Sequence, residues 1–255
     1  MAFAVGPFAV RWYGLAYLAG FVGAAAIAYY FARRWDLGLD FDDLTTIVLC
    51  IVLGLFVGAR LGYCLFYEPA YYLSNPLRII AFWNGGIAGM SFHGGLIGAV
   101  VGGLVTVRFV KVSLLRLGDL AVIGAPVGLA LGRMANFING ELWGKVTTMP
   151  WGVVFPGAGP LPRHPSQVYE ALLEGVLMLI MLLLLALRRP PLKPGAYLGI
   201  FLMLYGVFRI VVEFFRVPDM QLGYLLGGDW LTMGMVLSLP MLAVGAFLLY
   251  RVYSS

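Results

Sequence analysis

Apolar residues along the chain gather in long continuous runs separated by short polar segments. Each run has about the 20 residues that a helix needs to cross a bilayer. About seven such runs are present, at 12–32, 44–66, 87–109, 118–138, 168–187, 196–215 and 231–250. A membrane β-barrel would instead show segments of about ten alternating residues. The pattern therefore predicts an all-α, polytopic helical membrane protein, with residues 1–255 forming a single integral membrane domain.

The composition excludes a soluble protein. Hydrophobic residues make up 62% of the chain and charged residues only 11%, whereas a soluble domain carries about a quarter charged residues. The formal net charge of +5 fits cytoplasmic flanks that face anionic membrane lipid, and we expect no nucleic-acid partner. Cys50 and Cys64 fall in one apolar run without C-x-x-C spacing, so they predict small buried side chains and no metal site.

Lysine and arginine residues in the loops predict the side of the membrane on which each loop lies. With the N-terminus outside, the inside segments carry nine of these residues and the outside segments five, while three lie within or beside the spans. Because inside loops are enriched in Lys and Arg, the count favours an N-out, C-in topology. The loop 139–167 then lies on the outer face. Its many Pro and Gly residues resist helix formation and predict an ordered cap.

Ionisable residues within or beside the predicted spans are few. Each costs at least a few kcal/mol near the bilayer centre, so each is a functional hypothesis. They are Arg60, His93, Arg133, Glu141, Glu170, Glu174, Arg209 and Glu213.

Two pairs among them are four residues apart and share a helix face. Arg209 and Glu213 form one pair, for which the alternative interpretation is an internal salt bridge without further function. Glu170 and Glu174 form the other, for which the alternative is a partly hydrated position at the membrane interface. These two glutamates either contact a substrate or hold the adjacent RHPSQ segment in place.

Two further side chains have both a structural and a functional interpretation. His93 lies in GMSFHGGLIG, where neighbouring glycines let another backbone or a ligand approach closely. A neutral imidazole there either packs through a hydrogen bond or accepts a proton near physiological pH. Tyr13, at the outer end of the first span, is either an aromatic anchor at the interface or a site residue.

The stretch GRMANFINGELWG, residues 132–144, concentrates hydrogen-bonding groups directly after an apolar run. Arg133 offers a bidentate fork that suits a phosphate. Asn136 and Asn139 add amide donors and acceptors, Glu141 can hold a guanidinium in place, and Gly144 permits a tight turn. Since a purely structural cluster needs only enough polar groups to satisfy itself, the surplus of phosphate-matching donors indicates an anionic lipid headgroup.

This stretch resembles the signature of the prolipoprotein diacylglyceryl transferases, which act in the bacterial inner membrane. RWYGLAYLAG, GARLGYCLFY, SFHGGLIG, LPRHPSQVYEALLEG and YGVFRIVVEFFRVPD are similar to the other segments of that family, in the same order. Together these segments extend from about residue 11 to residue 250. The ordered set is far more specific than any one motif.

The resemblance implies transfer of the sn-1,2-diacylglyceryl group from phosphatidylglycerol to a cysteine thiol. The acceptor is the lipobox cysteine in the signal peptide of a preprolipoprotein, and the products are a thioether and glycerol-1-phosphate. The expected partners are thus phosphatidylglycerol, the signal peptide and membrane lipid. No cofactor is implied.

The resemblance also implies roles for individual residues. Arg133 and Arg209 match the phosphate-handling arginines, oriented by Glu141 and Glu213, and His93 matches the histidine regarded as the base. A base is dispensable if nearby arginines lower the pKa of the thiol. The catalytic candidates are Tyr13, His93, Arg133, Glu141 and Arg209. The substrate-binding candidates are Arg60, Arg133, Asn136, Asn139, Gly144, Tyr205, Arg209 and Glu213.

Two other functions fit a membrane protein with buried charges. A transporter or flippase for an anionic lipid would line its path with Arg and Glu, but it would show two related halves, which this sequence lacks. A CDP-alcohol phosphatidyltransferase would need several closely spaced aspartates for metal ions, and the spans contain no such cluster.

Overall fold

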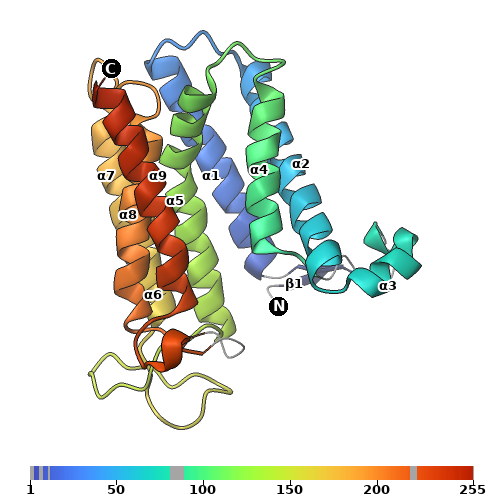
Figure 1. Ribbon diagram of the computed structural model, residues 1–255, viewed down its shortest axis with the longest axis vertical. Coiled ribbons are helices and arrows are strands. Elements are labelled where there is room, and N and C mark those ends of the chain that lie inside the picture. Colours follow the sequence, from blue (N-terminus) through green and yellow to red (C-terminus); the bar gives the residue numbers. More distant parts are fainter. Residues whose placement is uncertain (1–2, 6–7, 11, 81–88, 219–222, 255) are drawn as a thin grey trace. The chain divides into compact units, whose positions relative to one another are not determined.

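The computed structural model describes residues 3–5, 8–10, 12–80, 89–218 and 223–254. The chain divides into two compact units, one formed by Met1–Trp35 with Gly118–Ser255 and the other by Asp36–Leu117. Helices dominate both units (Figure 1). The predicted helical class is therefore confirmed. The described residues add one feature that we did not predict, a short antiparallel hairpin of β1 (Phe3–Val5) and β2 (Phe8–Val10).

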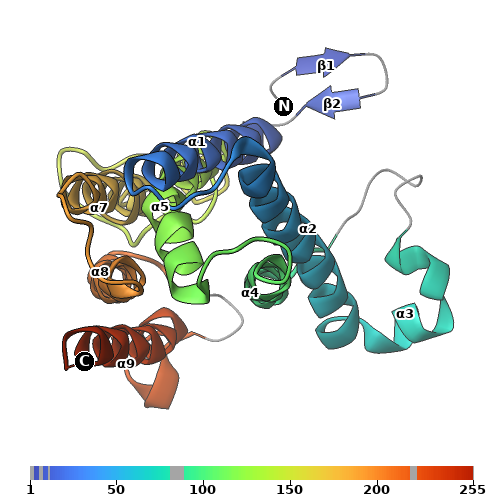
Figure 2. The ribbon, with the colours of Figure 1, turned by 90° about the horizontal axis from the view of Figure 1, so that it is seen from above.

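The first unit is a bundle of long apolar helices. Its helices are α1 (Trp12–Arg34), α5 (Leu114–Asn139), α6 (Ser166–Glu170), α7 (Met178–Ala186), α8 (Ala196–Glu213) and α9 (Met233–Ser254). A π-helical segment η2 (Ala171–Leu177) joins α6 to α7, so the three form one continuous span. A short 3-10 turn η3 (Leu225–Gly227) precedes α9. Seen from above, α1, α7, α8 and α9 follow one another alongside α5 (Figure 2).

Close helix contacts in this unit depend on small residues. A Cβ atom added to Gly175 would lie 2.5 Å from the Cβ of Ala130, so only glycine lets η2 approach α5 this closely. Small residues at helix interfaces are the usual means of packing inside a membrane, where lipid gives apolar side chains no reason to prefer each other. This contact lies one helical turn from Arg133, and it fixes how near the two helices bring their polar side chains.

The beginning of α8 is fixed by a buried carboxylate on α5. Asp119 is completely buried, and its side chain accepts hydrogen bonds from the backbone N–H groups of Gly195 (2.9 Å) and Leu198 (3.0 Å). A carboxylate at a helix N-terminus satisfies free N–H groups and interacts favourably with the helix dipole. Asp119 therefore fixes the position of α8 along its own axis relative to α5. It thereby also fixes the level in the bundle at which the polar residues at the far end of α8 lie.

The second unit pairs two glycine-rich helices. It contains α2 (Phe41–Phe66), α3 (Pro69–Ser74), the 3-10 helix η1 (Pro76–Ile79) and α4 (Phe92–Thr106). On the facing sides of α2 and α4, glycines recur every four residues. A Cβ atom on Gly58 would come within 2.3 Å of the carbonyl oxygen of Gly94, so the two backbones touch directly, as in small-residue membrane interfaces.

Six of the predicted spans are confirmed among the described residues, and the protein is a multi-pass membrane protein. The span predicted at 87–109 is wrong in its length. Residues 87 and 88 lie outside the described residues, and α4 has only 15 residues. It begins late because Gly89 has a positive φ of 85° and Ser91 caps the helix by accepting from the N–H of Gly94.

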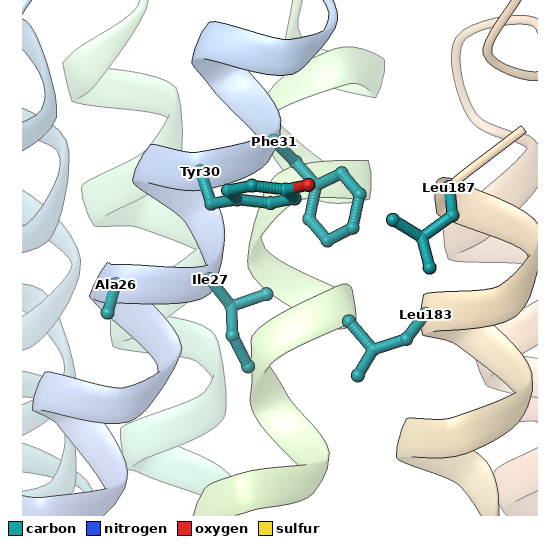
Figure 3. Close-up of a pocket in the computed structure, with 6 residues that line it drawn as sticks. All are labelled: Ala26, Ile27, Tyr30, Phe31, Leu183 and Leu187. Carbon is teal, nitrogen blue, oxygen red and sulfur yellow. The ribbon is translucent and has the colours of Figure 1, made fainter. Parts of the chain in front are cut away.

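An apolar pocket lies between α1 and α7. Ala26, Ile27, Tyr30 and Phe31 line one side, and Leu183 and Leu187 line the other (Figure 3). Its volume is about 360 Å³, and the six described residues that line it are uncharged. At 1.5 Å per residue, Leu183 lies about 20 Å along the helix from Glu170. The pocket is therefore separate from the polar residues described next.

Candidate active site

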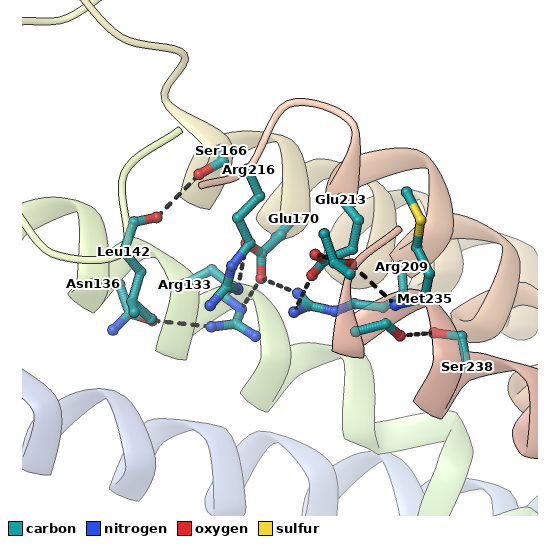
Figure 4. Close-up of polar contacts among 12 residues, drawn as sticks. Arg133, Asn136, Leu142, Ser166, Glu170, Arg209, Glu213, Arg216, Met235 and Ser238 are labelled. Atoms are coloured by element: carbon teal, nitrogen blue, oxygen red, sulfur yellow. Dashed lines mark hydrogen bonds and ion pairs between the residues drawn. The ribbon is translucent and has the colours of Figure 1, made fainter. Parts of the chain in front are cut away.

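One glutamate at the end of α6 lies among three arginines. The Oε2 atom of Glu170 is 2.5 Å from the Nε of Arg133 and 3.2 Å from an Nη of Arg209. Its Oε1 atom is 3.3 Å from an Nη of Arg216 (Figure 4). Glu170 is completely buried, and the side chains of the three arginines are 21%, 14% and 9% exposed. We call these four residues the arginine cluster.

Each member of the arginine cluster comes from a different part of the bundle. Arg133 lies near the end of α5, Glu170 ends α6, Arg209 lies in the last two turns of α8, and Arg216 follows α8. The end of α5 and the beginning of α6 adjoin the cap, residues 139–167 (Figure 1). Because the carboxylate is shared, Glu170 joins three segments that sequence separates widely.

A second glutamate orients Arg209 from the opposite side. Glu213 is 3% exposed, and its Oε1 atom is 2.5 Å from the other Nη of Arg209. Its Oε2 atom accepts a hydrogen bond of 2.7 Å from the Thr232 hydroxyl at the start of α9. Gly234 leaves room for this carboxylate, since a Cβ there would lie 2.4 Å from Glu213 Oε1. The predicted pairing of Arg209 with Glu213 is present, and it belongs to a larger network that includes Glu170.

A second polar chain leads from Arg133 to α1. An Nη of Arg133 donates to the Oδ1 of Asn136 at 3.4 Å, and the Nδ2 of Asn136 donates to the hydroxyl of Tyr13. Asn136 is 4% exposed. The structure thus brings Tyr13, Arg133 and Asn136 together, as one site requires. Tyr13 is not merely an aromatic anchor, because its hydroxyl accepts a hydrogen bond from the signature stretch.

Glu141 does not pair with Arg133. Its Oε1 atom accepts from the side-chain amide of Asn139 at 2.9 Å, and its backbone carbonyl accepts from Gln167 at 2.6 Å. The carboxylate that holds Arg133 is instead that of Glu170. The prediction that Glu141 orients the Arg133 fork is corrected accordingly, since the Glu141 carboxylate interacts with Asn139 and with the hydroxyl of Tyr13.

Gly144 connects the cap to the end of α8. Its N–H donates to the carbonyl of His164 at 2.9 Å, and its backbone pairs with that of Arg216. An added Cβ would lie 2.6 Å from the carbonyl oxygens of both His164 and Phe215. The absence of a side chain at Gly144 therefore allows close contact with protein backbone. By holding the neighbouring strand-like segments, Gly144 places Arg216 beside Glu170.

His164 lies in the cap beside two aromatic rings. Its Nδ1 atom is 3.0 Å from the hydroxyl of Tyr169, and its ring packs against Phe215 and Tyr169. Burial against these rings lowers the pKa of His164 below its usual value, because desolvation disfavours the charged imidazolium. The neutral form therefore predominates at neutral pH, and the ring acts as packing rather than as a cation for phosphate.

Glu174 and Tyr205 lie one helical turn from the arginine cluster. Glu174 is completely buried on η2. Among the described residues, neither of its carboxylate oxygens has a hydrogen-bond partner. Tyr205 lies one turn before Arg209 on α8 and is near enough to Glu174 for the two to interact electrostatically. The interpretation of Glu170 and Glu174 as partly hydrated interface positions is therefore wrong, since both side chains are fully buried.

Arg60 and His93 belong to the second unit. The Arg60 guanidinium donates to the backbone carbonyls of Arg78 (2.7 Å), Ile79 (2.7 Å) and Gly89 (3.2 Å), and it lies 5.0 Å from the ring of Tyr72. These contacts tie the ends of the segment between η1 and α4 to α2. His93 lies in the first turn of α4 with an exposed side chain.

Sequence reasoning identified Glu170 without its role and did not identify Arg216. Arg216 lies seven residues after Arg209 but beyond the end of α8, in a segment whose backbone pairs with Gly144. Helical spacing therefore does not reveal it, since its place beside Glu170 depends on that tertiary pairing. The contact between Arg133 and Glu170 joins residues 37 positions apart, and local spacing carries no information on such a pair.

The site combines a cationic surface with restricted solvent access. Three arginines surround the side chains of Glu170 and Glu213. A guanidinium keeps its charge even when buried, and its fork matches the oxygens of a phosphate. Such preorganised donors stabilise negative charge strongly when water is excluded. No group of three or more His, Cys, Asp or Glu side chains suited to a metal ion occurs within the described part of the chain.

The comparisons with known proteins agree with this chemistry. The family model of prolipoprotein diacylglyceryl transferase matches residues 1–251. The chain belongs to the prolipoprotein diacylglyceryl transferase family. It is 50% identical over 248 residues to the phosphatidylglycerol–prolipoprotein diacylglyceryl transferase of Oleidesulfovibrio alaskensis, covering 97% of this chain and 91% of that protein.

Further relatives within the family carry the same name. The protein of Rhizobium meliloti is 48% identical, with 99% of this chain and 91% of the relative covered. A Coxiella burnetii protein is also 48% identical, with 99% of this chain and 95% of the relative covered. Because the matches cover nearly the full length of both partners, family membership includes the signature stretch, the cap and the helices that carry the arginine cluster.

Proposed function

We propose that this protein transfers the diacylglyceryl group of phosphatidylglycerol to the lipobox cysteine of a preprolipoprotein, the first step of bacterial lipoprotein maturation. The single observation that carries the proposal is the arginine cluster: Arg133, Arg209 and Arg216 around the buried Glu170, in a chain of this family. A phosphodiester is the substrate group that matches converging guanidinium forks in a membrane protein.

The reaction is a displacement at the sn-3 carbon of the lipid glycerol. The sulfur of the cysteine forms a bond to this carbon, and the bond from carbon to phosphate oxygen breaks. The electron pair of the broken bond goes to the phosphate, which leaves as glycerol-1-phosphate. Negative charge therefore grows on the leaving oxygen, where fixed cations in a site of low dielectric contribute most to the rate.

Arg133 and Arg209 are assigned to this oxygen and its phosphate neighbours. Glu170 holds both forks in place, and Glu213 holds Arg209 from the other side. Asn136 fixes the remaining direction of Arg133 and connects it to Tyr13. Such preorganisation lowers the activation free energy by more than the contacts alone would, because the groups need not reorganise as the charge develops.

The other predicted residues keep their assignments as parts of this proposal, except that Glu170 replaces Glu141 as the carboxylate that orients Arg133. They are Arg60, His93, Asn139, Glu141, Gly144 and Tyr205. Of these, His93 is the candidate base. Gly144 supports the site through the backbone contacts that place Arg216, and Arg60 is kept as a substrate-binding candidate.

The proposed setting is the bacterial cytoplasmic membrane, with the N-terminus outside and the C-terminus inside. The cap, residues 139–167, then faces outward, on the side where signal peptides of exported proteins emerge. Both substrates reside in the membrane, one as a lipid and the other as a signal-peptide helix. The whole chain acts as one integral membrane domain in this proposal, and the many exposed apolar side chains of its helices suit direct contact with lipid.

A transfer assay with purified protein in detergent tests the proposal. Phosphatidylglycerol is supplied with a lipobox peptide whose cysteine is either intact or changed to serine, and mass spectrometry detects the products. We expect diacylglyceryl-peptide and glycerol phosphate from the cysteine peptide alone. An absence of covalent product from folded protein overturns the proposal and directs the test to lipid transport.

A further inference from the structure

The starting observation is a buried carboxyl group that the fold does not use. Glu174 is fully buried, and both of its carboxylate oxygens lack a hydrogen-bond partner among the described residues. Buried polar groups are nearly always hydrogen-bonded, because an unpaired one bears the full cost of its desolvation, which is larger still when the group is charged. Glu174 therefore contributes nothing evident to stability, and an unpaired group of this kind calls for a functional explanation.

The backbone around Glu174 is irregular. Residues Ala171–Leu177 form a π-helical segment between two α-helical ones. Such segments are rare and occur frequently at functional sites, because the extra residue per turn redirects side chains. Here it places Gly175, the neighbour of Glu174, against Ala130 of α5. Ala130 lies one turn before Arg133, so Glu174 is next to the helix that carries the main phosphate ligand.

Glu174 occupies a layer of the bundle directly beside the arginine cluster. It follows Glu170 by four residues, or about 6 Å along the helix axis. Tyr205 precedes Arg209 by four residues on α8 and interacts electrostatically with Glu174. Arg133, Arg209 and Arg216 all act on the charge of Glu174. A phosphate held by the arginine cluster thus has this layer on its membrane-interior side.

The chemistry of the displacement places a proton acceptor in that layer. The lipid carbon under attack is attached to the phosphate and lies toward the acyl chains. The thiol must approach this carbon opposite to the leaving oxygen, so its sulfur arrives on the membrane-interior side of the clamped phosphate. We propose that the Glu174 carboxylate accepts the proton of the attacking thiol. The proposal rests on the proposed function and adds a catalytic residue to it.

In this step, the proton and the charge that leave one group are taken up by another group of the same site. The S–H bond breaks and its proton bonds to an Oε atom of Glu174, while the sulfur electron pair forms the bond to carbon. The C–O bond breaks, and its electron pair stays on the phosphate. The phosphate gains one negative charge as Glu174 loses one, so the net charge of the site does not change. In a medium of low dielectric, such compensation avoids a large electrostatic cost.

The same step also gives the Glu174 carboxylate a hydrogen-bond donor, the attacking thiol. An unpaired carboxylate in an apolar region is costly, and a thiol that donates to it removes part of that cost. The acid form then has its O–H beside Tyr205, whose hydroxyl can accept a hydrogen bond. His93 remains the competing base, and the experiment separates the two.

The test compares the variants Glu174→Gln and His93→Gln with two acceptor peptides. One lipobox peptide carries cysteine and the other selenocysteine, whose selenol is more acidic and is already ionised at neutral pH. Removal of a general base costs about 10²- to 10⁴-fold in rate. We expect Glu174→Gln to lose at least about 100-fold in kcat/KM with the cysteine peptide and less than about threefold with the selenocysteine peptide. The exposed Glu68→Gln is the matched control, and it should leave both rates unchanged.

Each result either supports or overturns the role of Glu174 as the proton acceptor. Full activity of Glu174→Gln with the cysteine peptide overturns the proposal, as does an equal loss with both peptides, which identifies a structural role. A selective loss in His93→Gln alone assigns the base to His93. Should Glu174→Gln not fold, Glu174→Asp replaces it, and its cysteine-to-selenocysteine rate ratio must fall below that of the wild type. If the unaltered protein gives no product with either peptide, the proposed function itself has failed.

Discussion

The Nε atom of Arg133 lies 2.5 Å from Oε2 of Glu170, and this contact joins the end of α5 to the end of α6. Glu170 is completely buried and shares its carboxylate with two more arginines. The arrangement holds positive charge in place before any phosphate arrives. Each prediction below follows from one contact in or beside this network.

Replacing Glu170 with alanine should destabilise the protein strongly. The change leaves three arginines without their shared carboxylate, and removal of one partner of a buried ion pair costs about 3–5 kcal/mol. We expect the thermal unfolding midpoint in detergent to fall clearly for Glu170→Ala. Glu170→Gln, which keeps the shape and one acceptor, should lose less. An unchanged midpoint for the alanine variant contradicts a supporting role for Glu170.

Replacing Thr232 with valine should impair the reaction while keeping the shape of the side chain. The Thr232 hydroxyl donates to Glu213, which orients Arg209. Loss of a hydrogen bond to a charged group is worth about tenfold or more, so we expect kcat/KM to fall about tenfold. Thr232→Ser keeps the hydroxyl and should retain the activity. Equal activities of the two variants speak against this support of Glu213.

Replacing Gly144 with alanine should loosen the cap and displace Arg216. The added methyl group meets the carbonyl oxygens of His164 and Phe215, each at 2.6 Å. Overpacking of this kind costs about 1–3 kcal/mol. Limited proteolysis should cut the cap of the variant faster than that of the wild type. Gly14→Ala serves as the control, because a Cβ there meets no atom within 4 Å.

Acidification should destabilise the protein through His164. The pKa of the His164 side chain is lowered in the folded state because burial disfavours the imidazolium. In the unfolded chain the pKa of the same side chain is about 6.5. The unfolded state then binds more protons, so stability is complete above about pH 6.5 and falls as the pH decreases below it. His164→Gln removes this dependence. If the unfolding midpoints of both proteins change equally between pH 7.5 and 5, the assignment is wrong.

The sequence predicted the helical class, six of the spans and the pairing of Arg209 with Glu213. These follow from apolar run length and from i,i+4 spacing, both of which are local. Arg133 was also identified, because an arginine beside a membrane span costs free energy and therefore suggests a function. Its partner Glu170 could not be assigned, since that contact depends on how α5 and α6 pack.

Two further features depend on tertiary structure. Asp119 lies at the second position of a predicted span and received no assignment from the sequence, yet it caps α8 from α5. Glu174 gained its interest only from burial and from the absence of a described hydrogen-bond partner. Neither property is encoded in local spacing, because each is set by the neighbouring helices.

The central claim is that the arginine cluster binds the lipid phosphate and stabilises it as it leaves. Single-turnover transfer by purified Arg133→Ala, with phosphatidylglycerol and a cysteine lipobox peptide, tests this claim most directly. Loss of a preorganised donor to a developing anion costs about 10²- to 10³-fold, so we expect at least that loss in a protein that still inserts and folds. The exposed Arg251→Ala should transfer at the wild-type rate. Full activity of folded Arg133→Ala contradicts the claim.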